Sequence, residues 1–281
     1  MRLFIMFDEN REKVELPSGL IPLDIFVHSL DRELLTDRLE GSNRTIYRGY
    51  NDISRPIEIK FGLLSNDTKD YRLLRDAMYS LFYRYPRFYV AEKYQPGKLY
   101  HVSVSTSFIP DRLTQTMAEA RASLEIVGVP YAESMGTTAD IEAEGISSDD
   151  EIWGYGMGLI AEDLIYTHTA ISFSTFSIYN AGNVAIHPFE QDLKITISDV
   201  SENGNTMGLR NITTGDLFQI NEALGKADVV VMDGPKITKN GLQYLRQTNK
   251  EFITLVPGWN DFIVEGAYSA KVEFDFRFYY L

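Results

Sequence analysis

The segment 270–280 places the strongest constraint on the fold. In AKVEFDFRFYY, apolar residues alternate with Glu273, Asp275 and Arg277, the period-two pattern of a β-strand with one buried face. The buried face would carry five large side chains: Val272, Phe274, Phe276, Phe278 and Tyr280. A second layer of structure must cover so large an apolar face, so this strand predicts a layered β domain.

The residues before this strand support the same fold. Further strand candidates recur at short intervals between turn signals such as Asn240-Gly241 and Pro257-Gly258. These candidates span 169–180, 192–200, 207–212, 217–221, 228–233, 252–258 and 261–267. Many short strands with regular turns predict a β-sandwich of the jelly-roll type for residues 152–281.

The first part of the chain is also predicted to be mainly β, with one helix. In RPIEIKF, the apolar residues at 57, 59 and 61 alternate with charged ones, which indicates a half-buried strand. Between Asp70 and Pro86 the apolar spacing changes to i, i+3, i+4, so we expect a helix that Asp70 caps and Pro86 ends. Pro96-Gly97 then fits the centre of a type II turn between two strands.

The composition changes between the two parts. Residues 132–151 are small, polar and acidic, which predicts a linker between a domain at 1–131 and a domain at 152–281.

The chain has net charge −13, and between Ala122 and Leu193 it has twelve acidic residues and no Lys or Arg. Tight binding to a nucleic-acid backbone needs clustered Lys and Arg, so this charge pattern disfavours it.

No residue set predicts catalysis, a cofactor or a metal. The chain has no cysteine, which excludes disulfides and thiolate chemistry. The four histidines, His28, His101, His168 and His187, lack metal-ligand spacing on one helix, and no Gly-x-Ser-x-Gly is present. Adjacent carboxylates at 149–151 and at 162–163 do not by themselves give the cleft geometry that a glycosidase needs. No apolar run approaches the roughly 20 residues of a membrane helix.

Three aromatic residues are candidates to stack on a sugar ring: Trp153, Tyr155 and Trp259. Packing in the core or in a turn is the alternative for each of them.

A second candidate site is MGLRNITTGDLFQIN at 207–221, which holds adjacent threonines and an aspartate. We interpret its centre as a turn between two strands, in which Gly215 supplies backbone freedom and the polar side chains satisfy turn N–H groups. Leu209, Leu217 and Phe218 are candidates to pack inward.

The order of several segments resembles a known family. The first part contains RTIYRGYNDISRPIEIKF, a helix, KYQPGKLYHVSVS and ASLEIVGVPYAES. The second part contains EIWGYGMGL, YTHTAISFSTFSIYNAGNVAIHPFEQDLKITI, LRNITTGDLFQIN, ITLVPGWNDFIVEGA and VEFDFRFYY. In this order and spacing, over nearly the whole chain, the sequence resembles the distal tail proteins of siphophages that infect Gram-positive bacteria, the siphovirus-type tail component family.

The resemblance implies a structural protein of the virion rather than an enzyme. Such a protein is expected to form a hexameric ring through its first domain, with a galectin-like β-sandwich as the second. The ring would join the tail tube to the tail-tip, fibre or receptor-binding proteins around a channel for DNA. Assembly in the host cytoplasm is implied, with no cofactor and no membrane partner. The alternative is a carbohydrate-binding module that reads host-wall sugars through residues 152–281.

Overall fold

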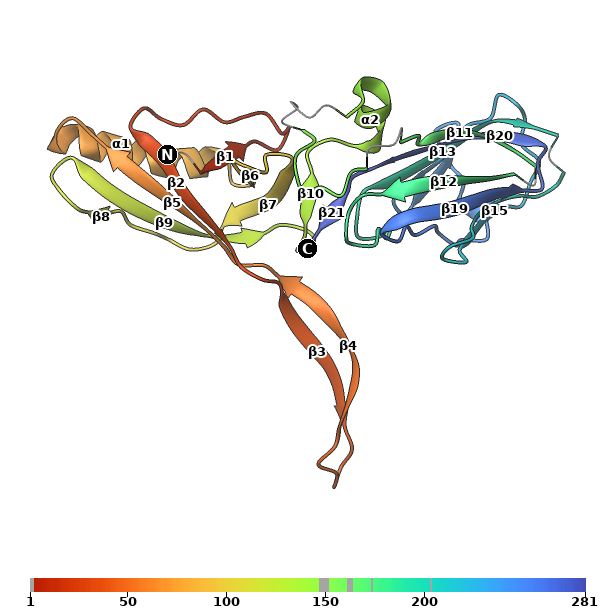
Figure 1. Ribbon diagram of the computed structural model, residues 1–281, viewed down its shortest axis with the longest axis horizontal. Coiled ribbons are helices and arrows are strands. Elements are labelled where there is room, and N and C mark those ends of the chain that lie inside the picture. The colour runs from red at the N-terminus through yellow and green to blue at the C-terminus, as the bar shows by residue number, and fades with distance from the viewer. Residues whose placement is uncertain (1–2, 147–151, 161–163, 173, 203) are drawn as a thin grey trace. The chain divides into compact units, whose positions relative to one another are not determined.

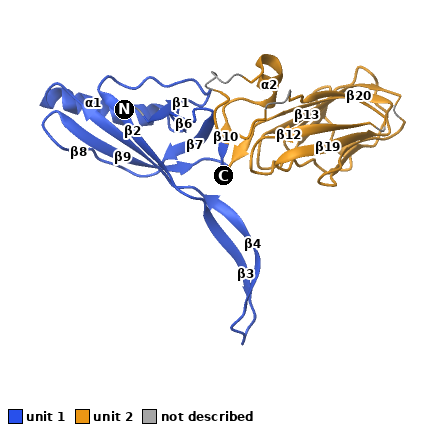
Figure 2. Ribbon diagram, in the orientation of Figure 1, with its two compact units in different colours: residues 1–132 blue, residues 133–281 orange. Residues whose placement is uncertain are grey.

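The computed structural model describes residues 3–146, 152–160, 164–172, 174–202 and 204–281. The chain divides into two compact units, Met1–Ala132 and Glu133–Leu281 (Figure 2). In both units, antiparallel strands dominate the described residues. The predicted mainly-β fold class is therefore confirmed. No helix among the described residues is long and apolar enough to cross a membrane.

Unit 1 contains a sheet whose strand order is β1-β6-β7-β9-β5-β2. Its strands are β1 (Phe4–Phe7), β2 (Leu20–Val27), β5 (Ile57–Leu64), β6 (Phe88–Glu92), β7 (Lys98–Val104) and β9 (Met117–Ile126), with the short β8 (Asp111–Arg112) beside β9. The predicted alternation in β5 is confirmed, because Ile57, Ile59 and Phe61 are fully buried. Lys98 N donates to Gln95 O across Pro96-Gly97, which places the predicted turn between β6 and β7.

Helix α1 (Thr68–Arg84) covers this sheet with its apolar face (Figure 1). The ring of Phe82 meets that of Phe61 edge-on at 5.8 Å, and Met78 is completely buried. The helix ends just before Pro86, as expected, but Asp70 is not its cap. Asp67 accepts from the N–H groups of residues 69 and 70 at 2.7 and 2.8 Å, so the helix begins one turn earlier than the apolar spacing alone indicates.

Two strands of unit 1 stand apart from this sheet. They are β3 (Asp31–Arg38) and β4 (Thr45–Ser54), which pair only with each other and form a long hairpin. The hairpin continues the direction of β2 and β5 and extends away from the sheet (Figure 1).

The segment predicted to be a linker is structured over its described part. It contains β10 (Ala132–Ser134), which pairs with β21 (Tyr279–Tyr280), and α2 (Thr138–Glu144). Asp140 Oδ2 accepts from Thr137 N at 2.7 Å in a capping box, and Thr138 Oγ1 donates to Phe274 O at 2.9 Å. Local capping and hydrogen bonds to a strand backbone thus order a segment whose composition is typical of a linker; residues 147–151 lie outside the described residues.

Unit 2 is a sandwich of two antiparallel sheets. One sheet has the order β11-β20-β13-β16-β17-β18 and the other β12-β19-β14-β15. Their bounds are β11 (Thr167–Ile171), β12 (Thr175–Asn180), β13 (Leu193–Ser201), β14 (Met207–Asn211), β15 (Leu217–Ile220), β16 (Val230–Asp233), β17 (Lys236–Lys239), β18 (Leu242–Gln243), β19 (Gly258–Glu265) and β20 (Ser269–Phe276); a 3-10 turn spans Leu245–Gln247.

An aromatic cluster joins the two sheets of unit 2. The ring of Phe274 on β20 lies 4.9 Å from that of Phe262 on β19 and 6.3 Å from that of Phe176 on β12. Val272, Phe274 and Phe276 on β20 are buried, as the alternation predicts. The predicted strand does not continue to Tyr280, because β20 ends at Phe276; Phe278, Tyr279 and Tyr280 are all buried beyond it, the last two in β21. The prediction of a strand at 252–258 is wrong: before β19 begins at Gly258, only Leu255 is paired, in an isolated bridge to Ile186.

Candidate functional site

The β3–β4 hairpin carries the most unusual surface among the described residues. Every residue of β3 is exposed, and so is most of β4. Seven large apolar side chains on the hairpin and its turn are at least 37% exposed: Leu34, Leu35, Leu39, Ile46, Tyr47, Tyr50 and Ile53. Single exposed apolar residues are ordinary, but seven on one hairpin are typical of an interaction surface.

The apolar side chains lie on both faces of the hairpin. Leu34 is directly opposite Tyr50, and Leu35 is directly opposite Gly49. Because neighbouring residues of a strand point to opposite faces, Leu34 and Leu35 cannot share one. A partner that buries all of this apolar surface must therefore contact both faces.

Polar contacts hold the hairpin in one shape. Arg32 Nε donates to Asp52 Oδ1 at 2.8 Å, and the Arg32 guanidinium lies 4.4 Å from the centroid of the Tyr50 ring. Tyr131, in the same unit, donates to Asp52 Oδ2 at 3.0 Å. Nearer the tip, Arg48 Nε donates to Asp37 Oδ2 at 2.6 Å. An isolated two-stranded hairpin is marginally stable in water, so these contacts favour an arm that is formed before a partner covers it.

The three aromatic residues predicted to face a sugar occupy different environments. Trp153 is only 4% exposed, with its ring 6.0 Å from that of Phe278, so it packs in the core of unit 2. Tyr155 is 91% exposed. Trp259 on β19 is 45% exposed and pairs with Tyr179 on β12. Of the three, only Tyr155 and Trp259 present a ring to solvent in this structure.

Three of the four histidines pack against aromatic rings. His101 stacks on Tyr89 at 4.5 Å, His168 stacks on Phe176 at 4.7 Å, and His187 lies 5.5 Å from Phe189. Over the described ranges, no group of three or more His, Asp or Glu residues could hold a metal ion.

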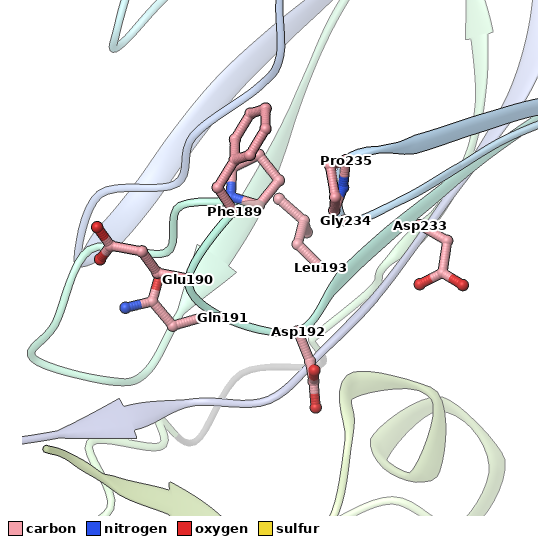
Figure 3. Close-up of a pocket in the computed structure, with 9 residues that line it drawn as sticks. Phe189, Glu190, Gln191, Asp192, Leu193, Asp233, Gly234 and Pro235 are labelled. Carbon is pink, nitrogen blue, oxygen red and sulfur yellow. The ribbon is translucent and has the colours of Figure 1, made fainter. Parts of the chain in front are cut away.

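Carboxylates gather around one open pocket of unit 2, shown in Figure 3. Its volume is about 270 Å³, and residues 188–193 and 233–235 line it. Glu190, Asp192 and Asp233 do not point toward one another in this pocket (Figure 3). The paired-carboxylate geometry of a glycosidase is therefore not formed here. The carboxylates at 149–151 and 162–163 lie outside the described residues.

The segment 212–216 is a turn between β14 and β15, as predicted from the sequence. Gly215 has φ +87°, and its N–H donates to Asn211 O at 2.9 Å. Asp216 Oδ2 accepts from Thr214 Oγ1 at 2.8 Å and from Thr254 N at 2.9 Å. Burial would raise the pKa of Asp216, but the hydrogen bonds from Thr254 and Thr214 outweigh it and lower that pKa.

One packing prediction for this turn is wrong. Leu209 and Phe218 are fully buried, but Leu217 lies on the outer face of β15. The period of two explains the difference, because the adjacent residues 217 and 218 cannot both point inward.

Residues 24–125, which include the whole hairpin, match the family model of the phage tail protein RIFT-related domain. No curated protein matches the sequence.

One solved structure extends the likeness to nearly the whole chain. This chain is similar to the Dit protein of phage SPP1, whose crystal structure is described as a paradigm of the hub adsorption apparatus in phages that infect Gram-positive bacteria. The match has a TM-score of 0.67 and 10% sequence identity, and it covers 99% of this chain and 100% of the Dit chain. A chain of the activated phage p2 baseplate matches with a TM-score of 0.44 and 10% identity, over 99% and 98%. The chain thus has the fold of the Dit protein of phage SPP1, and part of it matches a phage tail family model, in agreement with the resemblance seen in its sequence.

Proposed function

We propose that this protein is the distal tail hub of a siphophage and that unit 1 assembles into a hexameric ring. The observation that carries the proposal is the hairpin with uncovered apolar side chains on both faces. In a closed ring, each copy uses two different surfaces, one toward each neighbour. The hairpin is one of these surfaces, and a neighbouring copy covers it.

The distribution of charge supports this division of roles. Residues 1–132 contain 18 acidic and 18 basic residues, whereas residues 133–281 contain 22 acidic and nine basic ones. The net charge of −13 is therefore carried by unit 2 alone. A neutral unit 1 can pack against copies of itself without repulsion, while the acidic unit 2 disfavours close contact with its counterparts.

In this proposal the protein is structural and not catalytic. The ring binds the tail-tube protein on one side and the tail-tip, fibre or receptor-binding protein on the other, and DNA leaves the virion through the central channel. The protein's place is the tail tip of the virion, after assembly in the host cytoplasm. The family match and the likeness to the hub protein of phage SPP1 support this role.

The experiment compares the wild-type protein with a variant that carries Leu34→Ser and Tyr47→Ser. Light scattering after size exclusion should give the mass of six copies for the wild type and of one copy for the variant. Leu242→Ser, at a residue of unit 2 that is 76% exposed, is the matched control and should assemble normally. Circular dichroism should be the same for all three proteins. A hairpin variant that assembles like the wild type would exclude the hairpin as the ring contact.

A further inference from the structure

The base of the β3–β4 hairpin holds a buried arginine that forms no ion pair with any described residue. Arg55 lies between β4 and β5 and is only 6% exposed. Two residues before it, Ile53 on the hairpin is 59% exposed, and two residues after it, Ile57 is fully buried in the sheet. Arg55 therefore lies at the point where the chain passes from the uncovered hairpin into the core of unit 1.

The surroundings of Arg55 do not neutralise its charge. Arg55 Nε is completely buried without a hydrogen-bond partner, and Arg55 Cζ lies 5.9 Å from the centroid of the Tyr100 ring. Burial raises the pKa of Tyr100, although Arg55 acts in the opposite direction, so this phenol stays neutral at pH 7. Asp52, three residues earlier in the chain, accepts hydrogen bonds from Arg32 and Tyr131 instead.

A buried positive charge in this state favours an anion from outside the chain. Buried charges in proteins are paired, because moving a charge out of water is unfavourable unless an opposite charge compensates it. Glu92 on β6 acts electrostatically on Tyr100, but within the described residues it forms no ion pair with Arg55. The planar guanidinium matches the geometry of a carboxylate, which can accept two parallel hydrogen bonds from it.

Position and charge together indicate the source of that carboxylate. The uncovered apolar side chains of the hairpin extend to Ile53, so a copy that covers the hairpin also reaches its base. Each copy has 40 acidic and 27 basic residues and therefore carries a surplus of carboxylates. Nucleic acid is disfavoured as the source, because binding its backbone requires clustered Lys and Arg rather than one buried arginine.

We propose that Arg55 forms a buried ion pair with an Asp or Glu side chain of the neighbouring copy. Its terminal Nη atoms donate to the carboxylate oxygens, so assembly neutralises a charge that a single copy leaves buried. The apolar faces of the hairpin supply contact area, and the ion pair fixes the position of one copy against the next. This inference rests on the proposed ring and names the chemical group that the neighbour contributes to it.

The test replaces Arg55 with Met, which keeps an unbranched side chain but removes the charge. Arg55→Met in the full-length protein should weaken assembly about tenfold or more in analytical ultracentrifugation. In the background of Leu34→Ser and Tyr47→Ser, which is expected to be monomeric, the same change should leave the urea midpoint of unfolding unchanged or raise it, because an unpaired buried charge is removed. Arg210→Met is the matched control and should assemble normally, since Arg210 pairs with Glu265 inside unit 2.

A cross-linking experiment identifies where the carboxylate comes from. Arg55→Lys keeps the positive charge and should retain part of the assembly that Arg55→Met loses. A water-soluble carbodiimide then joins the amine at position 55 to an adjacent carboxylate, with loss of water. In rings formed from a mixture of isotope-labelled and unlabelled copies, mass spectrometry should find position 55 linked to an acidic peptide with the other label.

The possible results separate this inference from the proposed hub. It alone is overturned if Arg55→Met forms rings as well as the wild type does, or if position 55 is linked only to a carboxylate of its own copy. A lower urea midpoint for Arg55→Met in the monomeric background would show that Arg55 supports its own fold, and would overturn it as well. A wild type that forms no ring would overturn the hub and this inference together.

Discussion

Leu34 lies directly across the β3–β4 hairpin from Tyr50, and the two side chains are 62% and 48% exposed. A cross-strand apolar pair usually contributes to a core, but no other element of the described chain covers this one. Leu35 is also exposed, and it lies on the opposite face of the hairpin. The pair therefore supports the proposal that another chain completes this surface.

Glutamate substitutions on the two faces should each weaken self-association. Leu34→Glu and Leu35→Glu place a charge in the proposed contact from opposite sides, so each should weaken assembly about tenfold or more, as measured by analytical ultracentrifugation. Leu242→Glu in unit 2 should have no effect. An effect of Leu34→Glu alone would show that only one face of the hairpin is covered.

Trp153 and Tyr155 should differ sharply in their contribution to stability. Trp153→Ala leaves a cavity next to Phe278 and should lower the free energy of unfolding by about 3–5 kcal/mol. Tyr155→Ala changes a side chain that is 91% exposed and should alter it by less than about 0.5 kcal/mol. Urea denaturation measures both, and equal effects would contradict the core position of Trp153.

Gly215→Val should destabilise unit 2 through the backbone alone. A Cβ at Gly215 meets no atom within 4 Å, but its φ of +87° is a conformation that β-branched residues rarely adopt. The expected loss is about 1–3 kcal/mol in thermal or urea unfolding. Gly204→Val is the matched control, since its surroundings are equally open and its φ is outside the left-handed region. If both variants unfold like the wild type, the turn does not require glycine.

Asp216 should make the stability of unit 2 depend on pH. Its pKa is lower in the folded state than in the unfolded chain, so its contribution is fully present above the unfolded value of about 3.9 and is lost as the pH falls through the folded value. Asp216→Asn should therefore cost about 1 kcal/mol at pH 7 and progressively less below pH 4. Urea midpoints of both proteins at several pH values measure this difference. A difference that stays constant down to pH 2 would show that the carboxylate charge is not involved.

The sequence predicts those parts of the fold that follow local periodicity. The alternation from Val272 to Phe276 identifies a face that is buried in the structure, and the helical spacing locates α1 within a few residues. The turn at Gly215 follows from residue types that act within a few positions of one another. In contrast, α2 was missed although Thr137 and Asp140 have capping-box spacing, because the acidic composition around them is typical of a linker.

The candidate site could not be predicted in the same way. The apolar residues of β4 indicate a strand, but the pattern does not show that the described parts of the chain leave this strand uncovered. The partnership of Trp259 with Tyr179 likewise joins residues 80 positions apart, so it depends on the pairing of β12 with β19. Such long-range register becomes visible only in the folded sheet.

Electron microscopy of the purified protein in negative stain tests the central claim most directly. We expect closed rings with six-fold symmetry for the wild type, and single particles without rings for the variant with Leu34→Ser and Tyr47→Ser. Wild-type protein that remains monomeric at high concentration, and forms no ring when tail-tube protein is added, would contradict the proposed hub.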